Sequence, residues 1–190
     1  MTTSRADALL VKFRWPGRGP GVALRDLIAG HPVALQLRQF RAVDGDEGYA
    51  YVDVGDEGAA LARLAASLQE ALPGAVVARL AAMTGIAGAS SGAAAPWRYV
   101  VETDVLPERE ADFNAWYDSE HLPGLASVPG TVRAKRYRNV DGHPRYHACY
   151  DLVRPETLGS PPWLAVRATP WSGRVRPAFV NTRRTMFRCT

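Results

Sequence analysis

The sequence predicts an α+β protein made of tandem ferredoxin-like repeats, with the element order βαββαβ occurring twice. Three observations support this prediction: the two halves share a local sequence pattern, strand-like and helix-like segments follow one another in the same order in each half, and a small-residue segment separates them. Segments 8–13 and 76–82 are apolar on both strand faces, so we expect two sheets packed face to face as a barrel. Two independent ferredoxin-like domains on a flexible linker remain the alternative.

The internal repeat centres on an Asp-Gly pair in each half. QFRAVDGDEGYAYVD begins at Gln39 and RYRNVDGHPRYHACY begins at Arg136. The alignment matches Arg41 with Arg138, Val43 with Val140, Asp44 with Asp141, Gly45 with Gly142 and Tyr49 with Tyr146. Each Asp-Gly pair predicts a hairpin turn, because glycine adopts positive φ without steric cost. The uncharged, small-residue segment 85–96 predicts a linker, so the expected domains are 1–84, a degenerate repeat, and 97–190.

The remaining elements follow from hydrophobic periodicity. β-forming apolar runs predict strands, and leucines at 61, 64, 68 and 72 place one apolar face on a helix. The expected strands outside the hairpins are 8–15, 75–82, 97–105 and one between 178 and 187. The expected helices are 22–29, 58–71, 108–122 and a shorter one from about Pro155 that includes Trp163.

Composition restricts the partners and the setting. The net charge of +4 comes mainly from arginine, since Lys12 and Lys135 are the only lysines, and no basic run is interleaved with aromatic residues. We therefore expect no nucleic-acid partner. No apolar run is long enough to span a bilayer and no signal peptide is recognisable, so no membrane association and a cytoplasmic location are expected. Two cysteines do not make a disulfide framework.

The stretch FNAWYDSEHLPGLASVPG, residues 113–130, holds the candidate site. On a helix that ends or kinks at Pro123, Tyr117 and His121 lie four residues apart and can meet. An imidazole that titrates near neutrality transfers protons without a cofactor, so His121 and Tyr117 are the candidate catalytic residues and no cofactor is expected. Asn114, Trp116 and Asp118 are candidate ligand-binding residues. The alternative is a core helix whose aromatic residues pack on the sheet.

This stretch, followed by the strand RAKRYR, resembles the EthD-type family of the dimeric α+β barrel superfamily. The matching residues are Phe113, Asn114, Trp116, Tyr117, Glu120, His121, Leu122, Pro123, Val128, Pro129, Gly130, Ala134, Arg136 and Tyr137, with a similar TPW at 169–171. The resemblance covers residues 97 to about 187. It implies a dimeric-type α/β barrel with a ligand cleft between sheet and helices. The superfamily includes cofactor-free monooxygenases, isomerases, cyclases and haem-binding enzymes.

The first half departs from the family pattern. Its segment VALRDLIAGHPVA keeps His31 and Pro32 but lacks the Trp-Tyr pair. The predicted site therefore lies in the second half only, and the first half is a degenerate partner. Such a fusion allows either a monomer, through an internal pseudo-dimer, or a homodimer.

Two further residues have open interpretations. Arg136 either holds an anionic or carbonyl-bearing ligand or is surface charge, and Trp171 either closes a pocket or packs against a helix. A metal could be drawn at His143 with His147, or at His147, Cys149 and Asp151, but we expect none, because these residues lie on a turn and strand without helical spacing. Haem ligation by His121 is the minor alternative that the resemblance allows.

The predicted function is the binding of a small apolar or aromatic molecule between helix and sheet. The protein is then either a cofactor-independent enzyme, acting by proton transfer or monooxygenation, or a non-catalytic ligand-binding or assembly module. The accessibility of His121 separates these hypotheses. An imidazole that opens into a cleft beside Tyr117 favours the enzyme, whereas a ring sealed by Phe113 and Trp116 favours the second hypothesis.

Overall fold

The structure, a computed structural model, describes residues 7–15, 24–26, 28, 36–53 and 58–190. The chain forms two compact units. Unit 1 comprises residues 1–82, 138–142 and 187–190, and unit 2 comprises residues 83–137 and 143–186. Of the expected helix 22–29, residues 24–26 and 28 are described and are helical, whereas the expectation for His31 and Pro32 lies outside the described residues.

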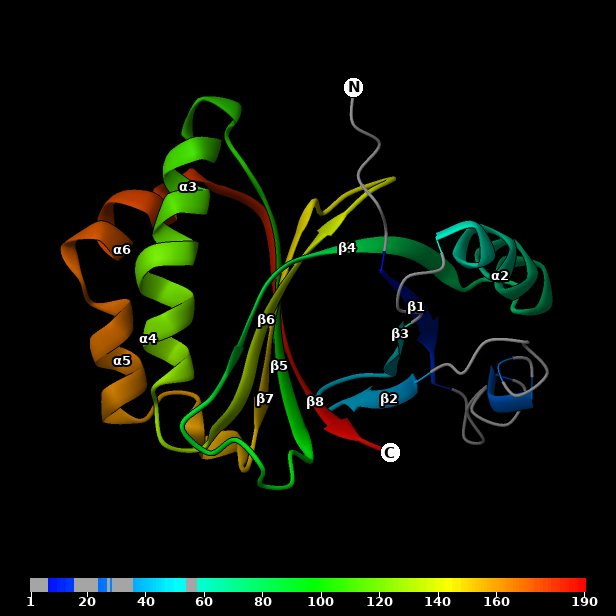
Figure 1. The fold of residues 1–190 in the computed structure, drawn as a ribbon, viewed down its shortest axis with the longest axis horizontal. Coiled ribbons are helices and arrows are strands. Elements are labelled where there is room, and N and C mark those ends of the chain that lie inside the picture. The colour runs from blue at the N-terminus through cyan, green and yellow to red at the C-terminus, as the bar shows by residue number, and fades with distance from the viewer. Residues whose placement is uncertain (1–6, 16–23, 27, 29–35, 54–57) are drawn as a thin grey trace. The chain divides into compact units, whose positions relative to one another are not determined.

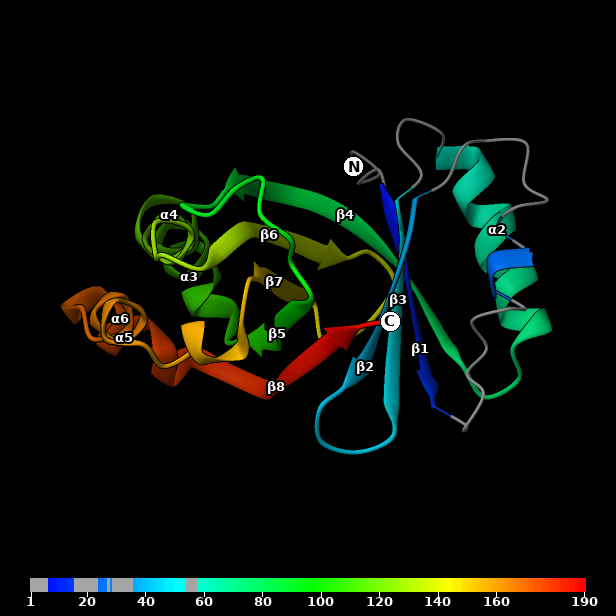
Figure 2. The same cartoon turned by 90° about the horizontal axis from the view of Figure 1, so that it is seen from below.

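Unit 1 contains an antiparallel sheet and one long helix (Figure 1). The elements are β1 (Ala8–Arg14), β2 (Gln36–Ala42), β3 (Glu47–Asp53), α2 (Gly58–Ala71) and β4 (Val76–Ala87), whose last residues belong to unit 2. Strand β1 pairs with β3 and β4, and β2 pairs with β3, which gives the order β4-β1-β3-β2. Leu61, Leu64 and Leu68 of α2 are buried in one cluster with Leu9 and Val11 of β1. Helix α2 therefore covers one face of the sheet through the leucine stripe that the sequence predicts (Figure 2).

Unit 2 places all of its helices on one face of its sheet (Figure 1). Its strands are β5 (Trp97–Val105), β6 (Thr131–Asn139), β7 (Tyr146–Leu152) and β8 (Phe179–Cys189), in the order β8-β5-β7-β6. Its helices are α3 (Glu110–Trp116), α4 (Leu122–Ala126), α5 (Pro161–Arg167) and α6 (Pro170–Val175), with 3-10 turns at Pro107–Arg109, Pro155–Thr157 and Arg176–Ala178. Aromatic and aliphatic side chains between these helices and the sheet form a second, separate core.

Hydrogen bonding runs through the eight strands in the order β1-β3-β2-β8-β5-β7-β6-β4 and closes as a barrel. The protein is therefore α+β with a closed antiparallel barrel, as the apolar character of both strand faces predicts. Strand β5 has the bounds expected from the sequence, and β4 and β8 run further than expected.

The segment predicted as a linker is tied to unit 2. Strand β4 continues to Ala87, and the amides of Gly88, Ala89 and Ser90 donate to carbonyls of Val132, Ala126 and Thr131 at 2.8–2.9 Å. A Cβ on Gly88 would lie 2.1 Å from the Thr131 carbonyl oxygen, so glycine is needed for this close approach. The small residues of segment 85–96 therefore allow close backbone hydrogen bonding in unit 2 as well as linking the two halves of the sequence. The domain boundaries 1–84 and 97–190 remain a prediction.

The sequence predicts that the helix of the 113–130 stretch ends or kinks at Pro123. The structure shows that it does not end there and continues to Ala126. A π-helical turn at Tyr117–His121 joins α3 to α4, and the Leu122 amide donates to the Tyr117 carbonyl five residues back. Proline is tolerated just after this turn because the first residues of a helical segment need no intrahelical N–H bond. Gly124 leaves room for α5, since a Cβ there would lie 2.8 Å from a methyl group of Val166.

The two Asp-Gly turns are stabilised in different ways. Gly45 has a φ of 95°, as predicted, whereas Gly142 is not among the described glycines with positive φ. Instead, the Asn139 side-chain oxygen accepts from the amides of Asp141 and Gly142, each at 3.2 Å. A side chain thus replaces the glycine conformation in stabilising the second turn.

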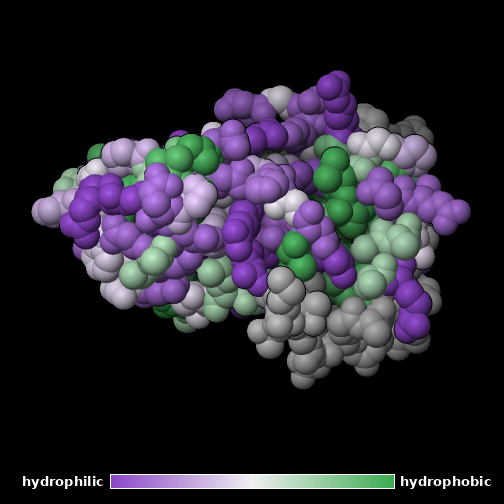
Figure 3. All heavy atoms as spheres, turned by 90° about the horizontal axis from the view of Figure 1, so that it is seen from above, coloured by the Kyte–Doolittle hydropathy of each residue, from purple (hydrophilic) through white to green (hydrophobic). Residues whose placement is uncertain are grey.

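The face drawn in Figure 3 is mostly hydrophilic, and its apolar side chains gather in a few separate areas. Within the described part of the chain, no helix has both the length and the apolar character needed to cross a membrane.

Candidate functional site

A pocket lies within unit 2, between its helices and the helix-facing side of its sheet. Residues from β5, β7, β8, α3, α4, α5 and the π-helical turn form its wall. Six of them are aromatic: Tyr99, Trp116, Tyr117, Tyr150, Trp163 and Phe179. The cavity volume is about 30 Å³, which is enough for a water-sized molecule but not for an aromatic ring. The wall chemistry, apolar with a few polar groups, is that of small-molecule sites.

His121 is the polar group at the centre of this wall. Its ring stacks on Trp116, with centroids 4.0 Å apart, and meets the edge of Tyr117 at 5.3 Å. The side chain is only 7% exposed, and its Nδ1 has no hydrogen-bond partner among the described residues. Burial, followed by the positive charges of Arg167, Arg176 and Arg136, lowers the pKa of His121 to about 3. The imidazole is therefore neutral at pH 7, with one unprotonated nitrogen whose basicity in the free protein is low.

The surroundings of His121 show features of both expected outcomes, a ring that opens into a cleft and a ring sealed by aromatic neighbours. The ring is nearly sealed by its stack on Trp116, yet it lines the pocket beside Tyr117. Tyr117 is buried, and burial raises its pKa to about 12. The phenol therefore stays protonated and can donate a hydrogen bond, but it cannot act as a base at neutral pH.

Asn114, Asp118 and Arg136 form a polar cluster that does not line the pocket. The Arg136 guanidinium donates to Asn114 Oδ1 at 2.8 Å and to Asp118 Oδ1 at 3.3 Å, and it lies 4.1 Å from the centre of the Tyr117 ring. Arg136 is 1% exposed, so its interpretation as surface charge is wrong. The surface-charge interpretation placed Arg136 on the solvent-facing side of its strand, whereas its side chain lies on the side that faces the helices. Asn114 and Asp118 thus contact Arg136 beside the Tyr117 ring, and the three side chains can hold that ring in place without lining the pocket.

Trp171 also lies outside the pocket wall. Its Nε1 donates to Asp112 Oδ1 at 2.9 Å, and this hydrogen bond is the main cause of a lowered Asp112 pKa. The neighbouring Thr169 begins α6: its hydroxyl accepts from the Ser172 amide and donates to Glu120 Oε1 at 2.6 Å. Trp116 Nε1 donates to the same carboxylate oxygen at 3.1 Å. The TPW segment thus fixes α6 to the helix that carries His121.

Sequence reasoning missed three arginines of the pocket, Arg167, Arg176 and Arg184. They come from α5, the 3-10 turn before β8, and β8, so nothing in their spacing predicts that they meet. It also missed Tyr99 and Tyr150 as wall residues. Strand alternation could have placed Tyr99 on the same face as Val101, and both line the pocket.

The residues considered for a metal are held by other partners. His143 Nδ1 lies 2.8 Å from Asp104, whereas the fully buried His147 lies 3.4 Å from Glu102. Asp151 accepts from Arg98 at 2.7 Å. Across the described ranges, no three His, Cys, Asp or Glu side chains are grouped so that they could hold a metal ion. On this face of β5 and β7, Arg98 lies opposite Asp151 and Glu102 lies opposite His147 in direct cross-strand register.

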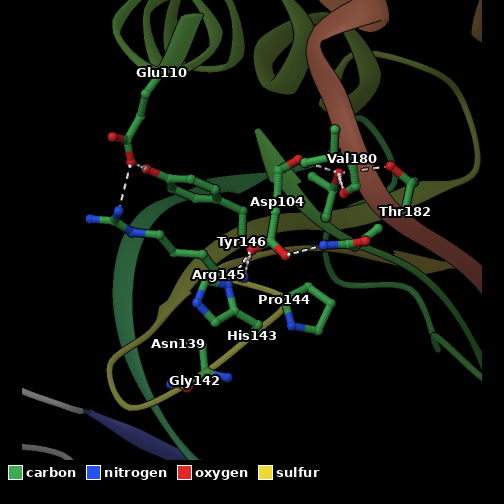
Figure 4. A network of polar contacts seen from close by, with 12 residues as sticks. Asp104, Glu110, Asn139, Gly142, His143, Pro144, Arg145, Tyr146, Val180 and Thr182 are labelled. Carbon is green, nitrogen blue, oxygen red and sulfur yellow. Dashed lines mark hydrogen bonds and ion pairs between the residues drawn. The ribbon is translucent and has the colours of Figure 1, made fainter. Parts of the chain in front are cut away.

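Asp104 joins three segments at the edge of unit 2 (Figure 4). Its carboxylate accepts from the Arg145 amide and contacts His143 Nδ1, both at 2.8 Å, and accepts from Asn181 Nδ2 at 3.1 Å. Burial raises the pKa of Asp104, but the hydrogen bonds outweigh it and the net pKa is lowered. Nearby, Tyr146 donates to Glu110 and so links β7 to α3. This network stabilises the fold and lies apart from the pocket wall.

Comparison with known proteins shows the fold. No protein-family profile matches the chain, and no curated protein matches it in sequence. A solved structure of a proposed monooxygenase from Fusobacterium nucleatum superposes with a TM-score of 0.69 at 10% identity, covering 100% of this chain and 94% of that one. An anthrone oxidase-like protein gives 0.63 at 13% identity, covering 100% and 92%. A chlorite dismutase from Candidatus Nitrospira defluvii gives 0.64 at 10% identity, covering 100% and 92%. The chain thus has the dimeric α+β barrel fold of these proteins.

Proposed function

We propose that this protein binds a small apolar or aromatic molecule at the unit 2 pocket, which must widen to admit a ring, and acts on it by cofactor-independent proton transfer. The observation that supports this most directly is the state of His121. It is a buried, neutral imidazole in the pocket wall, with an Nδ1 atom that no described residue satisfies. Tyr150 Oη and Trp163 Nε1 in the same wall also lack a hydrogen-bond partner among the described residues, and a ligand in the pocket would supply partners for these atoms.

The proposed step uses His121 as the base and Tyr117 as a donor, and it requires the bound ligand to raise the low pKa of the imidazole. An acidic C–H or O–H bond of the ligand breaks, a bond forms between that proton and the free imidazole nitrogen, and the electron pair stays on the ligand as an enolate or phenolate. The protonated phenol of Tyr117 is available to donate to the resulting oxygen. Trp116 holds the imidazole face by stacking, while Asn114, Asp118 and Arg136 position Tyr117 from behind. Monooxygenation would extend the same step with dioxygen as the co-reactant: a CH2 group of the ligand is oxidised to a carbonyl, one oxygen atom enters the product, and the other leaves as water with the two hydrogens of that group.

Haem is a candidate cofactor, because the superfamily that the sequence resembles includes haem-binding enzymes and a chlorite dismutase is among the similar structures. The residues of this pocket do not fit it. The cavity of about 30 Å³ has no space for a macrocycle. Trp116 covers one face of the His121 ring at 4.0 Å, so that face is not available to a large planar group. We therefore derive no step through haem.

A non-catalytic role in ligand binding or assembly is the second candidate. The small cavity and the stack between His121 and Trp116 favour it, because the same residues then serve as a packed core with one polar group. The two candidates differ in what they require of the imidazole: proton transfer requires its basic nitrogen, whereas packing requires only its shape.

We further propose that the chain is an EthD-like protein produced by fusion of two ferredoxin-like repeats, 1–84 and 97–190. The orders β4-β1-β3-β2 and β8-β5-β7-β6 support this, since each places the first and third strands of its half in the middle. The pocket lies entirely in the second half, as a degenerate first repeat would require. In this proposal the fused chain is a monomer or a homodimer.

Mass spectrometry of the purified protein under native conditions, followed by acid extraction, tests the binding proposal. We expect a small organic molecule to co-purify with the wild-type chain and to be depleted from the variant His121→Phe, which keeps a stacking ring without a nitrogen. His143→Phe is the matched control, since His143 lies outside the pocket. Equal loading of all three proteins would reject His121 as part of the site.

A further inference from the structure

Three arginines surround the pocket without acidic partners. Arg167, Arg176 and Arg184 line it from three elements, and none of the lining residues is acidic. No ion pair joins any of the three to a described carboxylate, whereas Arg98, Arg136 and other arginines of unit 2 have such partners. Arg176 and Arg184 are exposed and Arg167 is half-buried, so their guanidinium groups lie toward the mouth.

We propose that this arginine cluster is an anion subsite that binds the carboxylate of a small organic acid, whose apolar part enters the aromatic cavity. The inference rests on the proposed function, because it names the class of ligand for the same pocket. Guanidinium groups suit this task, since their planar donor forks match the two oxygens of a carboxylate.

Electrostatics support the assignment. Burial, and after it the charges of Arg167 and Arg184, lower the pKa of Arg176, as expected for a guanidinium that lies near two other cations. Such uncompensated charge destabilises the free protein and is relieved when an anion binds. The same cluster acts on the base, since Arg167 and Arg176 contribute to the low pKa of His121. A bound carboxylate would offset these charges and make the imidazole more basic only when ligand is present.

The subsite also explains how a small cavity serves a larger ligand. The enclosed volume of about 30 Å³ accepts a short apolar group, while a charged end stays at the mouth between exposed side chains. The methyl group of acetate is the smallest apolar group that tests this arrangement, whereas a ring such as that of benzoate requires the mouth to open.

Isothermal titration with matched acids and amides tests the proposal: acetate against acetamide, and benzoate against benzamide. We expect the acids to bind at least ten-fold more tightly than the amides, with affinity that falls as salt is raised. Arg167→Gln, Arg176→Gln and Arg184→Gln should each weaken acid binding by about ten-fold and leave amide binding unchanged. Arg154→Gln is the control, because it removes the same charge from an exposed site of unit 2 outside the pocket.

The outcomes separate the subsite from the pocket. Equal binding of acids and amides, or acid binding that the three glutamine variants do not weaken, overturns the anion subsite while the pocket itself stands. Acid binding that falls equally in Arg154→Gln also overturns it, because the effect is then one of net charge. If neither acids nor amides bind to the wild-type protein, both the subsite and the proposed function fail.

Discussion

Acidification should destabilise this protein through His121. The native pKa is about 3, whereas an unfolded histidine titrates near 6.5. Below pH 6.5 the histidine therefore binds a proton in the unfolded chain but not in the native state. The free energy of unfolding that this group contributes is fully present above pH 6.5 and decreases as the pH falls toward 3. Between pH 7.5 and pH 5.0 the loss is about 1.5 units of 1.36 kcal/mol each, or about 2 kcal/mol.

Urea unfolding of the wild type and of His121→Gln at both pH values measures this contribution. The variant carries no titrating group at the position, so the loss on acidification should be smaller by about 2 kcal/mol than in the wild type. Comparing the two differences cancels the titration of all other groups and any cost of the substitution at pH 7.5. An identical pH dependence in both proteins would refute the reasoning, since His121 would then be free to take up a proton in the native state.

Three further predictions concern substitutions in unit 2, one of them with a matched control. Gly130→Ala should lower the free energy of unfolding by roughly 3 kcal/mol, because φ is 97° and a Cβ would lie 2.3 Å from Thr157 Oγ1. Gly92→Ala is the control: φ is 91° but the space around it is open, so the loss should be only about 1 kcal/mol. Equal denaturation midpoints of the two variants would contradict this prediction. Thr169→Ala removes a helix cap and the bond to Glu120, and an unfolding free energy lower by about 1–2 kcal/mol is expected, whereas an unchanged value would show that α6 is held otherwise. Arg136→Met should lower stability by about 2–4 kcal/mol in urea unfolding, and a loss below about 1 kcal/mol would mean that its ion pair and ring contact matter little.

Local patterns in the sequence predicted the elements whose cause is local. The leucine spacing gave helix 58–71 with the bounds that the structure shows, and the β-forming run 97–105 is β5. The spacing of Tyr117 and His121 predicted that their rings meet, and their centroids lie 5.3 Å apart. Such predictions hold because each depends only on the geometry of one element.

The rest of the site depends on contacts between distant segments. Arg167, Arg176 and Arg184 meet only because α5, a 3-10 turn and β8 converge on one pocket. Arg136 looked like surface charge on an alternating strand, yet its partners are side chains of the helix packed above it. The helix passes Pro123 because a π-helical turn precedes it, and a sequence pattern does not reveal that turn.

The ¹⁵N resonances of the His121 imidazole, followed during a benzoate titration at pH 7, test the central claim most directly. The account predicts a neutral ring in the free protein and a large shift of the Nδ1 resonance on binding, as the ligand reaches that atom. A ring that is already protonated without ligand, or an Nδ1 resonance that stays unchanged while benzoate binds, would contradict it.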